Sequence, residues 1–261
     1  MALFHKDMLK EFFKRMMFYI TVPKCIFCGE ILDYTDKCFC PECKAKYDEW
    51  KNSRNCSRCA KVYFNCKCTN SLLEKNNIHT VYKLYRYRPQ DELTPSKRII
   101  FALKEDHRRD VIEFLADELS AAIVSSGLKI DRDAIFITNV PRRRKAIIKF
   151  GYDHAAELAK AVAKHLDLEY VSLLVSQSKR AQKKLSTAER RKNAKIKQKH
   201  GDFSRLKGKC AIIVDDIITT GASISAVSDN LKELGIRKRV AACVAIAYKD
   251  MEEKRTFTSL L

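Results

Sequence analysis

The sequence predicts an α/β protein, with a mostly parallel sheet flanked by helices and a small, zinc-ribbon-like cysteine module in front of it. Two observations carry this prediction. From about residue 78, apolar runs of strand length alternate with amphipathic helical patterns, which is typical of a parallel sheet. Nine of the eleven cysteines lie between Cys25 and Cys68. We therefore expect an amphipathic helical lead over 1–24, a cysteine-rich zinc-binding module over 25–70 and the α/β domain over 78–250.

The lead, residues 1–24, carries acids and bases throughout, whereas a secretory signal needs an unbroken apolar stretch. No run of 18 or more uncharged apolar residues occurs in the chain, so the sequence predicts no transmembrane segment. We expect a cytoplasmic protein whose first helix docks on its own domain. The alternative for that helix is a membrane surface.

The cysteine spacing predicts two structural zinc sites. A Cys-x-x-Cys turn points two thiolates at one tetrahedral ion, and a chain without an export signal favours metal over disulfides. The first site would use Cys25, Cys28, Cys40 and Cys43, and the second Cys56, Cys59, Cys66 and Cys68. Cys38 could replace Cys40, and pairing crossed between the sites stays open. Because four thiolates leave no position for water, we expect one or two Zn²⁺ ions that fold the segment.

The elements of the α/β domain follow in order. "IHTVYKLYRYR" (78–88) alternates and is rich in Val and Tyr, so we expect a strand. Thr94-Pro95 marks a helix start, and the next helix, within 111–127, ends at Gly127. Later strands are expected over 134–140, 210–216 and 239–248, and helices over 153–166 and 222–235.

Three single residues of this domain also carry expectations. Cys210 and Cys243 stand in apolar runs, so we expect them to be small core residues. His154, in the first turn of a predicted helix, is expected at the surface.

Because ligands of such sheets bind beyond the carboxyl ends of strands, Asp215–Asp216 and Pro141–Lys145 should lie on one rim.

The stretch "VDDIITTGAS" predicts a site for a ribose 5-phosphate group. The backbone N–H groups of Thr219 to Ser223 would open a helix near Ala222, and such a helix start binds phosphate. Gly221 permits close approach, and the hydroxyls of Thr219, Thr220 and Ser223 add donors. Asp215 and Asp216 can accept hydrogen bonds from vicinal hydroxyls and can lie beside Mg²⁺.

The charge is strongly positive and uneven. The net charge is +19, and thirteen Lys or Arg against Glu189 and Asp202 give +11 between Lys179 and Lys209 alone. A second basic cluster is "PRRRKAIIK", residues 141–149. Two zinc ions, each with four thiolates, would lower +19 only to about +15. The pattern indicates a phosphate-rich partner, namely a phosphorylated small molecule, nucleic acid or both, with a solvated surface as the alternative.

"IIVDDIITTGAS" resembles the 5-phosphoribosyl-1-pyrophosphate motif of type I phosphoribosyltransferases. The order of a cysteine head, "VYKLYRYR", "NVPRRR…FGYDHAAELA", "KRAQKKLSTAERRKN" and this motif resembles the ComF family of competence-associated, phosphoribosyltransferase-like proteins, similar also to the GntX group. The resemblance covers about residues 20–248. A more distinctive part of it is formed by Gln182, Leu185, Ser186, Glu189, Arg190 and Asn193.

The resemblance implies roles for matching residues. Asp215 and Asp216 would hold the ribose hydroxyls at the catalytic position. Thr219, Thr220, Gly221, Ala222 and Ser223 would form the 5′-phosphate loop. Pro141 and Arg142 would lie on the pyrophosphate side, and Arg180, Gln182 and Lys183 would belong to a basic loop that closes over the anion. The family usually has Arg-Gly-Phe-Asn-Gln where this chain has residues 150–154, and Lys149 could take part of the arginine's role.

Two functions follow from the resemblance. The preferred one is a DNA-uptake accessory protein, cytoplasmic or held at the inner face of the membrane through its partners. It would bind a phosphoribosyl ligand and act on single-stranded DNA with a helicase of the competence machinery. The alternative is an active phosphoribosyltransferase that uses phosphoribosyl pyrophosphate with Mg²⁺ and an unidentified base or amine. No residues that would read a base can be identified. Rings in "VYKLYRYR" and "KVYF" could stack on bases, with ordinary strand packing as the alternative.

Overall fold

The computed structural model describes residues 23–87, 94–105, 108–177 and 196–247. The helical lead predicted over 1–24 therefore lies almost wholly outside the described residues, as does most of the basic tract from Lys179 onward. The chain divides into two compact units, Met1–Trp50 and Lys51–Leu261. The four cysteines of the first predicted zinc site, and Cys38, belong to the first unit, and the four of the second predicted site belong to the larger unit.

The smaller unit has a compact aromatic core. Helix α2 (Pro41–Asn52) begins in it and buries Cys43 and Tyr47. The rings of Phe39 and Tyr47 stack with centroids 5.0 Å apart, and Phe27 meets Phe39 edge-on at 4.8 Å. Since the segment has few aliphatic residues, these rings supply much of its apolar contact beside the cysteines.

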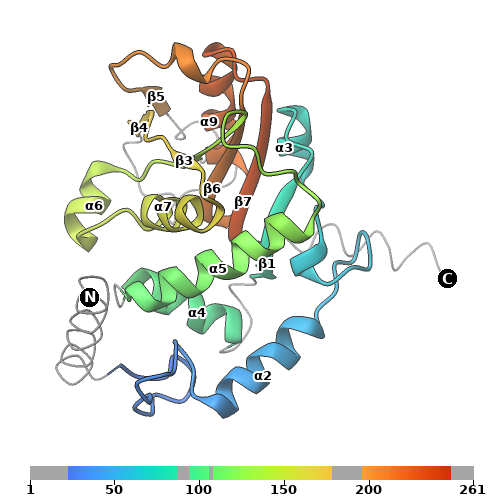
Figure 1. Ribbon diagram of the computed structural model, residues 1–261, viewed down its shortest axis with the longest axis vertical. Coiled ribbons are helices and arrows are strands. Elements are labelled where there is room, and N and C mark those ends of the chain that lie inside the picture. The colour runs from blue at the N-terminus through green and yellow to red at the C-terminus, as the bar shows by residue number, and fades with distance from the viewer. Residues whose placement is uncertain (1–22, 88–93, 106–107, 178–195, 248–261) are drawn as a thin grey trace, which may run out of the picture. The chain divides into compact units, whose positions relative to one another are not determined.

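The larger unit is built on a five-stranded parallel sheet in the order β1-β7-β6-β2-β3 (Figure 1). The strands are β1 (Val81–Arg86), β2 (Ile135–Asn139), β3 (Glu169–Tyr170), β6 (Cys210–Ile218) and β7 (Lys238–Ile246). Strand β7 is buried along most of its length and β6 is buried over residues 211–214, as expected when helices cover both faces. The predicted fold class is confirmed.

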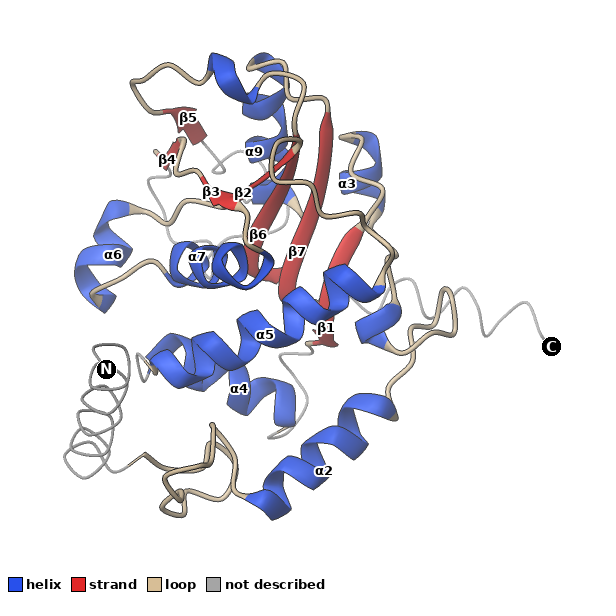
Figure 2. Cartoon of the chain, viewed as in Figure 1, coloured by secondary structure: helices blue, strands red, loops and turns tan. Residues whose placement is uncertain are grey.

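Helices cover the two faces of the sheet (Figures 1 and 2). On one face α5 (Arg109–Ser125) packs on α7 (His154–Leu166), with α4 (Pro95–Glu105) beside α5. On the other, α9 (Ala222–Glu233) packs on β6 and on the short α3 (Ser71–Lys75). The remaining helices are α6 (Arg144–Phe150) and the 3₁₀ turns η1 (Tyr63–Asn65) and η3 (Ser204–Leu206).

The main strands and helices begin and end within a few residues of their predicted limits. Ile224, Val227 and Leu231 form the buried face of α9, and Gly235, at φ 78°, follows its end. Some features of the α/β unit were not predicted from the sequence. Strand β6 continues to Ile218, two residues beyond the acid pair, and β4 (Leu174–Ser176) pairs antiparallel with β5 (Ile196–Gln198).

Two expectations about single residues need correction. His154 is not a surface residue, because only 2% of it is exposed and its ring meets the edge of Tyr152 at 4.4 Å. Cys243 is a fully buried core residue as predicted, whereas Cys210, at the start of β6, is only half-buried. None of the described helices combines the length and the apolar composition needed to cross a bilayer.

Candidate functional site

The candidate phosphoribosyl site lies where the chain leaves adjacent strands in opposite directions. From β2 the chain continues to β3 on one side, and from β6 it continues to β7 on the other. The Val140 N–H donates to the Val214 carbonyl at 2.9 Å, which brings Pro141 and Arg142 beside Asp215. In open α/β sheets a ligand crevice forms at such a switch point. The geometry thus places the two predicted segments on the same rim.

A lysine from another element joins the acid pair. Lys104, in the last turn of α4, forms an ion pair with Asp216, with 2.9 Å between Nζ and Oδ2. Both side chains are about one-fifth exposed. The Asp216 carboxylate also accepts the N–H of Ile217 at 2.6 Å, and the Asp215 carboxylate accepts the N–H of Asp216 at 2.9 Å. Two acids and one base therefore meet at the end of β6.

The surroundings shift the pKa values of the two acids in opposite directions. Burial and then the charge of Asp216 raise the pKa of Asp215 well above its usual range. Burial also opposes ionisation of Asp216, but the Lys104 ammonium and the Ile217 N–H outweigh it and lower the pKa of Asp216. The pair thus favours one neutral and one ionised carboxyl group. A neutral carboxyl can donate a hydrogen bond and an ionised one accepts, so together they suit two vicinal hydroxyls.

Asp153 anchors the segment after β2. Its Oδ1 accepts the Ala156 N–H at 3.2 Å and caps α7, while its Oδ2 accepts the Arg142 N–H at 2.9 Å. Burial raises the pKa of Asp153, although these two N–H groups act against the rise. Arg142 also donates through Nη1 to the Tyr152 carbonyl at 3.5 Å. One carboxylate thus fixes both the helix start and the loop that carries Arg142.

The predicted phosphate loop lies at the start of α9. Gly221 adopts a left-handed conformation, φ 81°, directly before the helix. A Cβ atom at this position would lie 2.9 Å from two carbon atoms of Leu73. Thr220 Oγ1 accepts the Ala222 N–H at 3.3 Å, and Thr219 is exposed. The loop therefore needs glycine for both its backbone angle and its packing, and it presents a helix start beside Asp215 and Asp216.

A basic loop was predicted to close over the anion at this site. Arg180, Gln182 and Lys183 lie outside the described residues. Their predicted closure over the anion stays a prediction. In the sequence this segment lies between the paired antiparallel strands β4 and β5, and Ser176 of β4 forms a β-bridge with Arg143 of the rim.

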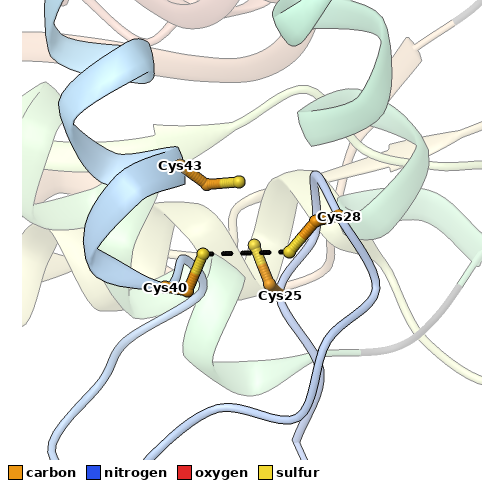
Figure 3. Close-up of side chains that lie close together, drawn as sticks. All are labelled: Cys25, Cys28, Cys40 and Cys43. Carbon is orange, nitrogen blue, oxygen red and sulfur yellow. Dashed lines mark hydrogen bonds between the residues drawn. The ribbon is translucent and has the colours of Figure 1, made fainter.

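The first cysteine cluster brings together the sulphur atoms of Cys25, Cys28, Cys40 and Cys43 (Figure 3). They all lie within 4.8 Å of one another, and Cys28 and Cys40 are 3.8 Å apart. A tetrahedral site with Zn–S bonds of about 2.3 Å has sulphur–sulphur edges of about 3.8 Å. Burial opposes ionisation of Cys25, but the N–H groups of Cys28, Cys40 and Phe27 lower its pKa to about 7. This donor set fits zinc, and Cys38 is not part of it.

The second cluster is formed by Cys56, Cys59, Cys66 and Cys68, again within 4.8 Å of one another. Its first turn repeats the hydrogen bonds of the first cluster. Cys25 N–H donates to residue 30 and Cys56 N–H to residue 61, and both cysteine carbonyls accept the N–H four residues on. Gly29 and Ala60 occupy that fourth position, each with positive φ. The uncrossed pairing of cysteines is therefore the one that the structure brings together, and both clusters could hold a metal ion.

The aromatic segments are mostly part of the core. Tyr63, Tyr82 and Tyr85 are buried, whereas Phe64 and Tyr87 are half-buried. Phe64 borders a cavity of about 480 Å³ whose lining includes Lys61, Lys67 and Tyr82. Core packing thus accounts for three of the rings, Tyr63 in η1 and Tyr82 and Tyr85 in β1, whereas Phe64 lies beside two lysines at this cavity.

Three residues of the rim were missed by reasoning from the sequence. Lys104 is separated from Asp216 by 112 positions, and no local pattern distinguishes it from other helix-ending lysines. His154 adds positive potential that lowers the pKa of Asp216. Asp153 did carry a signal, because an acid directly before a helical pattern predicts an N-cap.

Comparison with known proteins agrees with this geometry. Residues 153–258 match the family described as "Phosphoribosyl transferase domain". The "Competence protein ComFC" of Streptococcus pneumoniae is 24% identical over 234 residues, covering 82% of this chain and 96% of that protein. The matched domain begins at Asp153, so Lys104 and Arg142 lie before it.

Two solved structures are also similar. A hypoxanthine phosphoribosyltransferase from Staphylococcus aureus has 14% identity and a TM-score of 0.34, covering 53% of this chain and 63% of that one, less than two thirds of its length. A purine phosphoribosyltransferase from Pyrococcus horikoshii Ot3 has 20% identity and a TM-score of 0.28, covering 64% and 85%. From these comparisons we conclude that the chain carries a phosphoribosyl transferase domain and is similar over most of its length to a ComFC protein, with two cysteine clusters that could hold metal ions.

Proposed function

We propose that this protein binds a phosphoribosyl ligand and assists the uptake of single-stranded DNA in natural transformation. The observation that carries the first part is the rim itself, where Asp215 and Asp216 stand next to a glycine-dependent helix start. The acids would hold the ribose hydroxyls, and residues 219–223 would hold the 5′-phosphate. Pro141 and Arg142 would face the pyrophosphate. Mg²⁺ would accompany phosphoribosyl pyrophosphate and balance its charge.

The second part rests on the similarity to a protein named for competence and on the basic tract. The protein would work in the cytoplasm, at the inner face of the membrane through its partners, where it would receive the incoming strand together with a helicase. The two cysteine clusters would hold structural Zn²⁺. Four thiolates saturate such an ion, so its role is to fold the surrounding segment.

Titration calorimetry with phosphoribosyl pyrophosphate and Mg²⁺ tests the ligand. Asp216→Asn combined with Thr220→Ala removes a charged acceptor and a phosphate donor. At about 1.5–3 kcal/mol for each charge-assisted bond, the loss should be about 3–5 kcal/mol, more than a hundredfold in affinity. Asp229→Asn changes an exposed acid on α9 and should leave binding unchanged. Wild-type affinity in the double variant would show that the ligand binds elsewhere.

An active phosphoribosyltransferase is the second candidate, and the match to the transferase domain favours it. It would transfer ribose 5-phosphate to a base or amine and release pyrophosphate. A screen for pyrophosphate release with candidate acceptors separates the two functions. Release that depends on an acceptor and is lost in the Asp216→Asn, Thr220→Ala variant would establish the enzyme, whereas binding without release would favour the accessory role.

A further inference from the structure

Lys83 is a fully buried lysine in the middle of β1. None of its surface is exposed, and it pairs in register with Cys243 of β7. Lysine is almost never fully buried unless its charge is compensated, since the ammonium group loses its hydration. The position of Lys83 therefore calls for a negative partner.

The contacts of Lys83 satisfy its hydrogen bonds but not its charge. Nζ donates to three backbone carbonyls, those of Cys66 at 3.0 Å, Cys68 at 2.8 Å and Val81 at 3.2 Å. These use all three donors of the ammonium group. Carbonyl oxygens carry only partial charges, and across the described residues no carboxylate forms an ion pair with Lys83.

Two of these carbonyls belong to cysteines of the second cluster. The ammonium group thus lies against the backbone of two residues whose sulphur atoms belong to the cluster. Zinc held by four thiolates carries a formal charge of −2. We propose that Lys83 is the buried counter-cation of a zinc–thiolate centre at Cys56, Cys59, Cys66 and Cys68, and that it couples this centre to the parallel sheet. The inference rests on the proposed zinc.

A counter-cation makes the effect of removing the lysine depend on the metal. With zinc bound, the positive charge offsets the excess negative charge of the centre, so a neutral residue should weaken zinc retention. Without zinc, the buried charge is a cost, and an apolar side chain of similar length should stabilise the fold. A lysine that serves only packing or hydrogen bonding would shift stability in the same direction in both states.

The test uses the full chain and measures zinc transfer to a chromogenic chelator. Lys83→Met should lower the affinity of the second cluster for zinc about 10–100-fold, which is the usual loss when a group that supports the metal ligands is removed. Zinc at the first cluster is the internal reference. Lys67→Met is the matched control, because Lys67 lies between the same two cysteines but is exposed and donates to the Ser126 carbonyl at 2.7 Å.

Lys83→Gln separates charge from hydrogen bonding, because glutamine is neutral but can still donate to the carbonyls. It is also the variant to measure if Lys83→Met does not fold. It should lose zinc faster as well. The thermal midpoint of Lys83→Met should fall with zinc and rise with chelator, relative to wild type. Zinc retention like that of wild type in both variants, or a midpoint that falls equally in both states, would overturn the counter-cation while leaving the zinc proposal intact. A purified wild type without zinc would overturn both.

Discussion

At the scale of single residues, the acid pair is the most informative feature of the rim. Asp215 and Asp216 are neighbours in sequence, yet their surroundings shift their pKa values in opposite directions. The difference comes from Lys104, whose ammonium group forms an ion pair with Asp216. Burial would lower the pKa of Lys104, but the pairing with Asp216 raises it, so the ion pair persists at neutral pH.

Neutralising each acid should therefore change stability in opposite directions. When folding raises the pKa of an acid, the fold loses stability as the pH rises from the unfolded pKa, about 3.9, to the folded pKa. Asp215→Asn should thus raise the free energy of unfolding at pH 7, with the gain vanishing below about pH 4. An acid whose folded pKa is lowered contributes stability above its unfolded pKa, and this is lost as pH falls through the folded pKa. Asp216→Asn should cost about 1.5–3 kcal/mol at pH 7.

Urea unfolding at pH 4 and pH 7 checks both signs. The Asp229→Asn variant again controls for a change in net charge, since it removes an exposed acid. Equal destabilisation by both substitutions at pH 7 would mean that the two carboxyl groups share one environment, in contradiction to the ion pair with Lys104.

At this scale, local sequence patterns predict some residues of the sites and not others. The two groups of four cysteines were predicted from spacing within short windows, and the structure brings each group together. The acid pair and the loop from Thr219 to Ser223 were predicted from one short stretch, and their role in binding stays a prediction. Lys104 and the burial of Lys83 and His154 could not be identified in this way. Each depends on a contact between segments that only the folded chain brings together. Lys83 stands in an alternating strand pattern, and nothing in that pattern reveals that two cysteine carbonyls cover it.

At the scale of elements, the link between α3 and α9 supports the phosphate loop. Leu73 of α3 lies against Gly221, and Asn70, which caps α3 through the Leu73 N–H, also donates to the Thr220 carbonyl at 3.5 Å. The short helix α3 was not predicted, because five residues are too few to show a helical period. It nevertheless contacts the phosphate loop, through Leu73 and through its cap residue Asn70.

Gly221→Ala should therefore disturb both stability and binding. The new methyl group combines a left-handed backbone, which costs about 1–2 kcal/mol, with a clash against buried Leu73. Gly127→Ala is the matched control, since Gly127 has φ 79° but nothing within 4 Å of an added Cβ. Chemical unfolding and calorimetry with phosphoribosyl pyrophosphate should show a larger loss for Gly221→Ala in both measurements. Equal losses of stability with unchanged affinity would show that the contact with Leu73 is unimportant.

The cysteine clusters belong to different units, so their loss should have different consequences. Cys43→Ser removes one ligand of the first cluster, whose four residues all lie in the unit Met1–Trp50. Zinc content should fall by about one ion per chain, and limited proteolysis should cut this unit while the larger unit stays resistant. Cys210→Ser, at a half-buried position in β6, controls for the loss of a thiol. A protein without metal that nevertheless keeps the wild-type digestion pattern would end the idea of a structural ion here.

At the scale of the whole molecule, the charge exceeds what one small ligand can neutralise. The net charge is +19, and +11 of it lies between Lys179 and Lys209. At the described end of this tract Lys197, Lys199 and Lys207 are exposed. Such a density attracts a polyanion, and the proposed function makes single-stranded DNA the polyanion to test.

The last prediction tests this polyanion. Binding of an oligothymidine should weaken with salt, with log K falling by about 0.7 per phosphate neutralised for each tenfold rise in salt. Replacing Lys183, Lys184, Arg190 and Arg191 by Gln should flatten that slope by about two to three units if all four make contacts. The control replaces four exposed lysines elsewhere, Lys75, Lys129, Lys164 and Lys232, and makes the same change in net charge. Fluorescence anisotropy at several salt concentrations gives both slopes. If the two variants behave alike, the protein attracts DNA only through its net charge, and the tract is a solvated surface with no special role in uptake.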